Sequence, residues 1–312
     1  MAHGWRRKGL HCDFGARVSD RYRKMPKSPV VVLILVHMSD PNPHEEMSLR
    51  QCFRVLGAHP IRLVCPKKLD TSKYRSIVPG IDIDFIDPDW QSTYANFNRL
   101  KIDPFLYRRY RDYEFILFYE LDAFVFRDEV GQWCGRGFDY IGAPWFDLPW
   151  MQTIDGLAKY VEGTKHYERA AVGNGGLSLR RVDAALKILS SFSWVSRPSQ
   201  IWKNSESAWL GRRVASLIKN VTIANNSFHL LNTFEANEDL FWGIYMKRNF
   251  DWFAVAPVEE ALKFSQHGTP SSSVKNGGVL PFGCHGWWKD NADFWIPLVR
   301  KASADSRSEI AT

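Results

Sequence analysis

The sequence lacks any long apolar run. The longest, Val30 to Val36, is too short to cross a bilayer, and no charged-then-apolar leader with a small-residue cleavage site precedes it. Cysteine is scarce as well. The five cysteines among 312 residues are widely spaced and form no CxxC pair, which indicates neither a disulfide framework nor a zinc knuckle. We therefore expect a cytoplasmic protein.

Positive charge is not spread evenly along the chain. The formal net charge is +7, and residues 1–27 hold eight Lys or Arg against two Asp, which leaves the rest of the chain nearly neutral. A basic terminus of this kind is most often a solvated tail, and the alternative is contact with an anionic membrane surface or a nucleic acid. We expect a flexible tail at residues 1–28, with peripheral contact at the inner face of the membrane as the alternative, and no nucleic-acid partner.

Internal repeats and low-complexity segments are also absent, whereas aromatic residues are abundant. Thirteen Trp and eleven Tyr are more than a core of this size requires, and such rings often line clefts for sugars. After Pro29, short apolar runs alternate with longer mixed segments, as in a mostly parallel sheet with crossover helices. We expect strands at residues 30–37, 61–65, 81–86, 115–119, near 140 and at 173–179, and helices at 45–56, 92–110 with a break near Pro104, 182–189, 238–247 and 292–300.

Two carboxylates follow the most apolar of these predicted strands. In FILFYELDAFVF, residues 115–126, Glu120 and Asp122 lie two positions apart, so both face the same side of the strand, at the end where parallel sheets bind ligands. With no Lys or Arg beside them in the sequence, they would repel each other unless a cation lay between them or one stayed protonated. Such oxygen ligands suit Mg²⁺ or Mn²⁺, which binds a diphosphate through open positions. The alternative is that they cap the following turn, with Arg127 paired to one of them.

The segment around these acids belongs to a set of motifs that carries a family resemblance. The motifs are Tyr119–Phe126 (YELDAFVF), Trp133-Cys134, Asp139–Trp145 (DYIGAPW), Asn98-Arg99-Leu100, Gly173–Arg180 (GNGGLSLR), Asn237–Trp242 (NEDLFW) and Leu280–His285 (LPFGCH). Together they resemble a bacterial family of glycosyltransferases, catalogued as a domain of unknown function and linked to capsule and lipopolysaccharide loci. The resemblance covers nearly the whole chain after the basic tail.

The resemblance implies a GT-A-type α/β fold, in which a Rossmann-like, mostly parallel sheet flanked by helices is joined to an acceptor-binding half. Residues 29–301 would form one domain, with a nucleotide-sugar half at 29–145 and an acceptor half at 146–301, followed by a polar tail at 302–312. The implied reaction moves a sugar from a nucleotide-sugar donor, with a UDP-sugar favoured, to a glycan or lipid-linked acceptor in cell-surface polysaccharide synthesis.

The resemblance also implies a metal site. Asp122 and Glu120 would hold Mn²⁺ or Mg²⁺, which stabilises the charge that develops on the departing nucleoside diphosphate. His285 matches the C-terminal histidine that several GT-A enzymes use as a third ligand, although a histidine packed in a turn is an equal alternative. The sequence departs from the family at Glu120, where Gln is common, which makes Asp122 the better ligand candidate. It also departs at Phe264-Ser-Gln-His267, where the family has Phe-Ser-Phe-Glu.

A general base and donor contacts complete the implied site. Asp239 matches the base of inverting GT-A enzymes, with Glu238 contacting acceptor hydroxyls. The alternative for both is a structural role in the first turn of a helix capped by Asn237.

Donor contacts are expected from the segments around residues 98 and 174. Gly175 and Gly176 strip side chains from a strand edge, which allows a ligand to approach the backbone and leaves Asn174 as the polar contact; a simple bulge is the alternative. Asn98 and Arg99 would meet the donor's ribose or phosphates, although an exposed Arg without a ligand is equally common.

Three classes of function remain open on the residues alone. An inverting, metal-dependent glycosyltransferase accounts for the acids, the histidine, the glycines and the aromatic surplus together. A nucleotidyltransferase would also use an acid pair on such a sheet, but no Gly-rich, Lys-bearing phosphate loop follows the first predicted strand. A non-catalytic carbohydrate-binding protein would keep the tryptophans and have no use for ordered acids.

Overall fold

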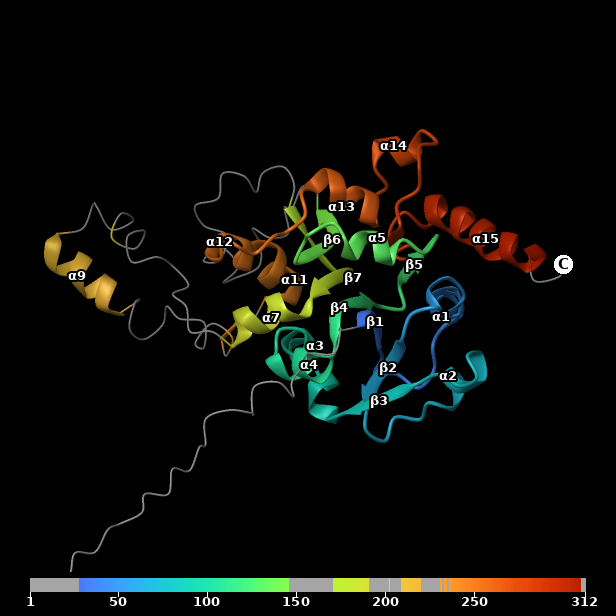
Figure 1. Cartoon of the computed structure of the whole chain (residues 1–312), viewed down its shortest axis with the longest axis horizontal. Coiled ribbons are helices and arrows are strands. Elements are labelled where there is room, and N and C mark those ends of the chain that lie inside the picture. Colours follow the sequence, from blue (N-terminus) through green and yellow to red (C-terminus); the bar gives the residue numbers. More distant parts are fainter. Residues whose placement is uncertain are drawn as a thin grey trace, which may run out of the picture.

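The computed structural model describes residues 28–145, 171–190, 202, 209–219, 231, 233–234 and 236–309 of the chain. Figure 1 shows a central sheet flanked by helices. The predicted basic tail lies outside the described residues except for Ser28, and so does much of the predicted acceptor half between residues 145 and 238.

Six of the described strands form one sheet in the order β3-β2-β1-β4-β7-β6. Their bounds are β1 Ser28–Leu35, β2 Ile61–Pro66, β3 Ile83–Ile86, β4 Tyr113–Tyr119, β6 Tyr140–Trp145 and β7 Ala171–Arg181. The first four of these strands along the chain run parallel, with Val31 opposite Ile116 in the centre, whereas β7 is antiparallel to both of its neighbours. The predicted α/β fold with a mostly parallel, helix-flanked sheet is therefore confirmed.

A second, three-stranded sheet among the described residues lies at the end of β4. It consists of β5 (Ala123–Val125), β9 (Gly283–His285) and β8 (Ser265–His267), in the order β5-β9-β8. β5 pairs antiparallel with β9, which places Ala123 opposite His285, and β9 pairs parallel with β8, which places His285 opposite His267. The sequence predicted none of these short strands, and their pairing brings the C-terminal segment to the end of β4.

Capping residues and proline explain where two of the flanking helices begin. Asn42 caps helix α1 in a reciprocal box: its side chain accepts from the backbone amide of Glu45, whose carboxylate accepts from the amide of Asn42 at 2.8 Å. Pro104 is the first residue of helix α4 and divides the helix predicted at 92–110, as expected, because proline suits only the first turn. The helix bounds to this point are α1 Pro43–Leu56, α2 Ser72–Ile77, η1 Pro88–Gln91, α3 Tyr94–Leu100, α4 Pro104–Arg109 and α5 Val130–Cys134.

The later helices differ from the predictions in form and in length. The bounds are α7 Val182–Leu189, α9 Leu210–Lys219, α11 Glu238–Leu240, η4 Phe241–Met246, α12 Lys247–Asn249, α13 Val258–Phe264, α14 Ser272–Lys275 and α15 Ala292–Glu309. The helix predicted at 238–247 begins as expected but changes to a π-helical turn in η4. The closing helix α15 continues to Glu309, into the segment predicted as a polar tail. None of the described helices is both long and apolar enough to cross a membrane.

The centre of the core is β4, as predicted from its unbroken apolar run. Residues from Phe115 to Tyr119 are each at most 1% exposed, because β1 and β7 cover the two edges of the strand and helices cover its faces. The acid pair therefore begins directly after the most buried part of the sheet, which fixes its position.

Replacing Leu117 by Ala should lower the free energy of unfolding by ~2–5 kcal/mol, because the side chain is fully buried and a cavity remains. Denaturant unfolding measures the change. The matched control is Val279→Ala, at a side chain that is 84% exposed, where we expect a change within ~0.5 kcal/mol. Equal effects in the two variants would contradict the placement of β4 in the core.

Candidate active site

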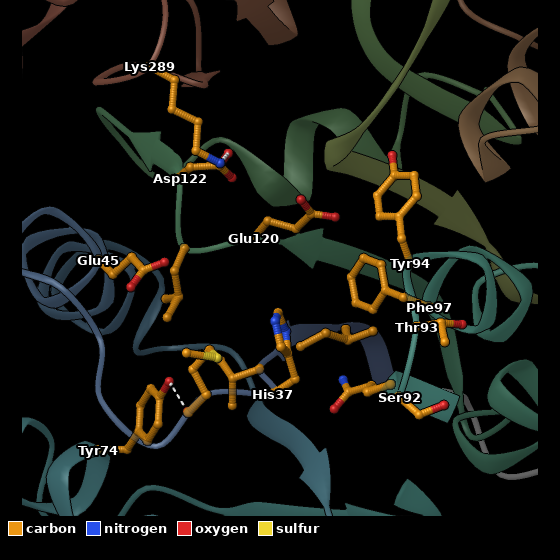
Figure 2. Close-up of a pocket in the computed structure, with 15 residues that line it drawn as sticks. His37, Glu45, Tyr74, Ser92, Thr93, Tyr94, Phe97, Glu120, Asp122 and Lys289 are labelled. Atoms are coloured by element: carbon orange, nitrogen blue, oxygen red, sulfur yellow. Dashed lines mark hydrogen bonds and ion pairs between the residues drawn. The ribbon is translucent and has the colours of Figure 1, made fainter. Parts of the chain in front are cut away.

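A cavity of about 420 Å³ opens where β1 and β4 end. Its lining includes Glu120 and Asp122 from the end of β4, His37 from the segment after β1, and Tyr94 from the start of α3. Figure 2 shows Lys289 reaching Asp122, with Glu120 beside them. Parallel sheets bind ligands at this edge, so the sequence-based location of the site agrees with the cavity.

Three potential metal ligands meet at the rim of this cavity. One ligand atom each from Glu120, Asp122 and His285 lie within 4.8 Å of one another. His285 Nε2 is 2.8 Å from Asp122 Oδ1 and 3.6 Å from Glu120 Oε2. The pairing of β5 with β9 brings the histidine here, and the backbone amide of Gly286 donates to the Asp122 carbonyl at 2.9 Å. The three residues predicted as metal ligands are thus brought together.

Glu120 and Asp122 each form ion pairs with positively charged side chains. Burial alone would raise the pKa of Glu120, but the Lys101 ammonium, which forms an ion pair with it, and His285 lower it to about 2. Burial would also raise the pKa of Asp122, and His285 together with Lys289, 2.7 Å away, holds it well below its usual range. The repulsion expected between the acids is thus relieved by positive side chains of the protein, Lys101, His285 and Lys289, which the sequence did not place beside them. Arg127 takes no part, because it pairs with Glu129 at 2.5 Å.

A second histidine backs the first. His267 Nδ1 lies 2.8 Å from His285 Nδ1, and the two rings stack with centroids 4.9 Å apart. Burial and the neighbouring His285 lower the pKa of His267 to about 4. Burial alone would lower the pKa of His285, but the charge of the neighbouring Asp122 raises it to about 9. The histidine pair was not predicted as a unit.

The three potential ligands fit a divalent cation. They offer two carboxylates and one imidazole nitrogen, and His285 Nε2 is a buried atom that lies close to Asp122. Lys289 is 59% exposed, so its side chain can leave Asp122 when a cation replaces its charge. Oxygen-rich ligand sets of this kind suit Mg²⁺ and Mn²⁺.

Glu120 belongs to a set of four charges, of which the other three, Lys101, Arg180 and Glu238, are buried. Lys101, whose side chain is 2% exposed, pairs with Glu120 and lies 3.4 Å from Glu238. Arg180, equally buried, lies 2.7 Å from the other oxygen of Glu238. Two positive and two negative charges therefore compensate one another, which is what buried ions require. Glu238 is only 3% exposed, so the surface that its predicted contact with an acceptor would need is lacking.

Asp239, the predicted base, lies next to this set and is only half-buried. Loss of solvent and the charge of Glu238 raise the pKa of Asp239 to about 7, and its Oδ1 accepts a hydrogen bond from the backbone amide of Leu240 at 2.8 Å. Tyr94, at the cavity rim, donates from its hydroxyl to Asn237 at 3.2 Å. The start of α11 thus borders the wall of the cavity, and the role of Asp239 as a base stays a prediction.

Asn174, Gly175 and Gly176, which are predicted to contact the donor, contact other residues of the protein in this structure. A Cβ at Gly175 would overlap the Glu238 carboxylate, and one at Gly176 would overlap the His285 ring. Asn174 is buried, and its Oδ1 accepts from the amide of Gly176 at 3.2 Å. The missing side chains therefore make room for Glu238 and His285, which is a different use from the predicted approach of a ligand.

The two residues of α3 that are predicted to contact the donor are not among those that line the cavity, and their contact with a donor stays a prediction. Asn98 is buried; its Oδ1 accepts from the amide of Glu238 at 3.0 Å, and its amide nitrogen donates to the carbonyl of Tyr94. Arg99 is exposed and is not among the residues that line the cavity. Asn98 thus fixes the start of α11 against α3, which is a structural task.

Four charged or polar residues of the site were missed in the sequence: Lys101, Arg180, His267 and Lys289. Lys101 and Lys289 reach the acids only through the fold, because they are far from them along the chain. The departure at Phe264-Ser-Gln-His267 was the one signal that pointed to His267.

Comparisons with known proteins identify a family and similar solved structures. A family model described as "Protein of unknown function (DUF5672)" matches residues 80–285, a range that contains all three proposed metal ligands. No curated protein matches the chain.

Among solved structures, the mannosyltransferase Ktr4p from S. cerevisiae is 14% identical with a TM-score of 0.37, over 53% of this chain and 60% of its own. The galactosyltransferase LgtC in complex with donor and acceptor sugar analogues is 9% identical with a TM-score of 0.45, over 88% of this chain and 95% of its own. The core-mannan synthase A of Aspergillus fumigatus, in an Mn/GDP form, is 11% identical with a TM-score of 0.34, over 69% of this chain and 72% of its own. Sequence identities and TM-scores this low do not assign an activity to this chain. Its activity has to be argued from the site.

Replacing Lys101 by Met should destabilise the protein by ~3–5 kcal/mol, because Glu120 and Glu238 then lose a buried counter-charge. Denaturant unfolding at pH 7 measures the loss. Lys263→Met is the matched control: this ammonium is 62% exposed and pairs with Glu260 at the surface, so we expect at most ~1 kcal/mol. A loss of similar size in both variants would mean that the buried charges do not depend on Lys101.

Proposed function

The chain belongs to the DUF5672 family of proteins of unknown function, and we propose that it is a metal-dependent glycosyltransferase that moves a sugar from a nucleotide-sugar donor to a hydroxyl acceptor. One observation carries the proposal: Glu120, Asp122 and His285 converge at the rim of a 420 Å³ cavity beside the carboxyl ends of two parallel strands. A divalent ion there would face a cavity of the size of a nucleotide, which is the arrangement that transfer from a nucleoside diphosphate requires.

The donor would lie along the cavity with its diphosphate at the acid end. Lys289, which lines the cavity above Asp122, supplies a cation for phosphate oxygens there (Figure 2). Tyr74, Tyr94 and Phe97 line other parts of the wall and offer aromatic surface to a nucleoside. A UDP-sugar is the favoured donor, on the resemblance of the motifs.

Asp122 and His285 would hold the ion, with Glu120 as a further ligand, directly or through water. Mn²⁺ or Mg²⁺, when bound, would stabilise the negative charge that develops on the departing nucleoside diphosphate. It would therefore stabilise the transition state more than the ground state. Lys101 keeps Glu120 ionised and oriented, because its buried ammonium forms an ion pair with that carboxylate. Because Gly176 has no side chain, the His285 ring can approach the acids.

Asp239 is the proposed base of an inverting transfer. A carboxyl group with a pKa near 7 is suited to take a proton from the acceptor hydroxyl at neutral pH, because it is strong enough as a base and still ionised in part. Glu238, held by Lys101 and Arg180, would position the start of α11, and with it Asp239. This positioning task replaces the predicted contact between Glu238 and the acceptor.

The biological setting rests on the motif resemblance. On that basis we propose a glycan or lipid-linked acceptor in capsule or lipopolysaccharide synthesis, at the cytoplasmic face of the membrane. A nucleotidyltransferase is not favoured, because residues 36–42 after β1 contain neither Gly nor Lys to hold a triphosphate.

Asp122→Asn should abolish Mn²⁺-dependent hydrolysis or transfer, with a loss of about 100-fold or more, because it removes a negative ligand of the cation. The assay incubates the protein with a panel of nucleotide sugars, with and without chelator, and measures the nucleoside diphosphate released. Asp128→Asn is the matched control, because Asp128 pairs with His59 away from the cluster. Release of pyrophosphate would favour a nucleotidyltransferase, and chelator-insensitive activity would contradict the metal site.

The pH dependence of the reaction should follow Asp239. Its carboxyl group is neutral below a pKa of about 7 and can act as a base only above it, so kcat/KM should rise about tenfold per pH unit below 7 and level off above. Rates at fixed Mn²⁺ from pH 5 to 9 test this. Asp239→Asn should remove both activity and the inflection, whereas Asp82→Asn, at an exposed surface pair, should keep both. A rate already level at pH 5.5 would exclude Asp239 as the base.

A further inference from the structure

His267 lies behind His285 and is not used by the proposed mechanism. It is the last residue of β8 and stands directly opposite His285, the last residue of β9, because the two strands pair in parallel. The Nδ1 atoms are 2.8 Å apart and the rings stack at an interplanar angle of 27°. His267 therefore contacts the nitrogen of His285 that faces away from the acids.

The short distance restricts where the protons are. Two N–H groups would repel at 2.8 Å and two bare nitrogens would form no bond, so one ring donates and the other accepts. If His267 donated, neutral His285 would carry its proton on Nε2, and no lone pair would face the acids. If His267 accepts, neutral His285 is protonated on Nδ1 and bare on Nε2. Only the second arrangement lets His285 bind a cation.

The other side of the His285 ring agrees with the second arrangement. Its Nε2 is buried and faces both acids, 2.8 Å from Asp122 Oδ1 and 3.6 Å from Glu120 Oε2, with which it would share a cation. The contacts of Nδ1 with His267 and of Nε2 with Asp122 set the orientation of the ring, and the missing side chain of Gly176 makes room for Nε2, because a Cβ there would overlap it. A nitrogen so placed is suited to a cation held with Asp122 and Glu120.

We propose that His267 is a positioning residue whose bare Nδ1 accepts the Nδ1 proton of His285 and so fixes the tautomer in which His285 binds the divalent cation. The inference rests on the proposed function for the presence of the cation. Partners of this kind orient metal-binding histidines, and their loss costs about 10–100-fold in metal affinity. In many metal sites the group that accepts this histidine proton is a carboxylate. In this protein the acceptor would be the neutral imidazole of His267.

Two variants separate the acceptor from the ring. His267→Phe keeps an aromatic ring for stacking but removes the acceptor, whereas His267→Asn keeps an acceptor, because its Oδ1 occupies the same place on the side chain as Nδ1. Calorimetric titration of the full chain with Mn²⁺ at pH 7.5 should give a Kd raised about 10–100-fold in H267F and close to wild type in H267N. Thermal melting of each variant shows whether it is folded.

The tautomer itself can be measured on the unaltered chain. Long-range ¹H–¹⁵N correlation spectra of the ¹⁵N-histidine-labelled protein with Mg²⁺ should show His285 protonated on Nδ1 and His267 protonated on Nε2. The reverse pattern overturns the inference, even where a variant does not fold. Equal Mn²⁺ affinity in wild type and H267F overturns it and leaves the proposed function standing. A wild-type chain that binds no Mn²⁺ overturns the inference together with the metal site.

Discussion

The site depends on the Lys101 ammonium, which lies buried between two carboxylates from different parts of the chain. Glu120 follows the central strand, and Glu238 begins the helix that carries Asp239. Because a buried charge is tolerated only when it is compensated, Lys101 with Arg180 makes both acids possible at this depth. One cation therefore connects the proposed metal end of the site with its proposed base. Moving either element would leave a charge unpaired, which gives the arrangement its rigidity.

The parts of the site that depend on the local residue pattern could be predicted from the sequence. The apolar run before Glu120 predicted the central strand, and alternation along it predicted that Asp122 faces the same side. His285 came from motif resemblance, because β5, β8 and β9 have only three residues each and show no periodicity of their own. Lys101 and Lys289 were out of reach, because which cation meets which acid is decided by the fold and not by neighbourhood in the chain.

The glycines of β7 show how the same residue pattern can serve a different purpose. The sequence left two interpretations open, an edge where a ligand approaches the backbone and a simple bulge, since Gly175 and Gly176 carry no side chains. In the structure, the space they leave is filled by Glu238 and His285 from segments that lie later in the chain. Glycine signals close approach of some group, and sequence alone does not say whether that group is a ligand or the protein itself. The glycines thus still support the site, one step removed from the donor.

Two carboxyl groups in this site are driven in opposite directions by their surroundings. His285 and Lys289 hold the pKa of Asp122 far below its usual range, so it is a permanent anion at any physiological pH. No cation of the described residues forms an ion pair with Asp239; solvent loss and the neighbouring Glu238 raise its pKa to about 7. A permanent anion can bind a cation but is a poor proton acceptor, whereas a carboxylate poised near neutrality can accept a proton and release it again. The division of tasks between metal ligand and base follows from which acid has a cation beside it.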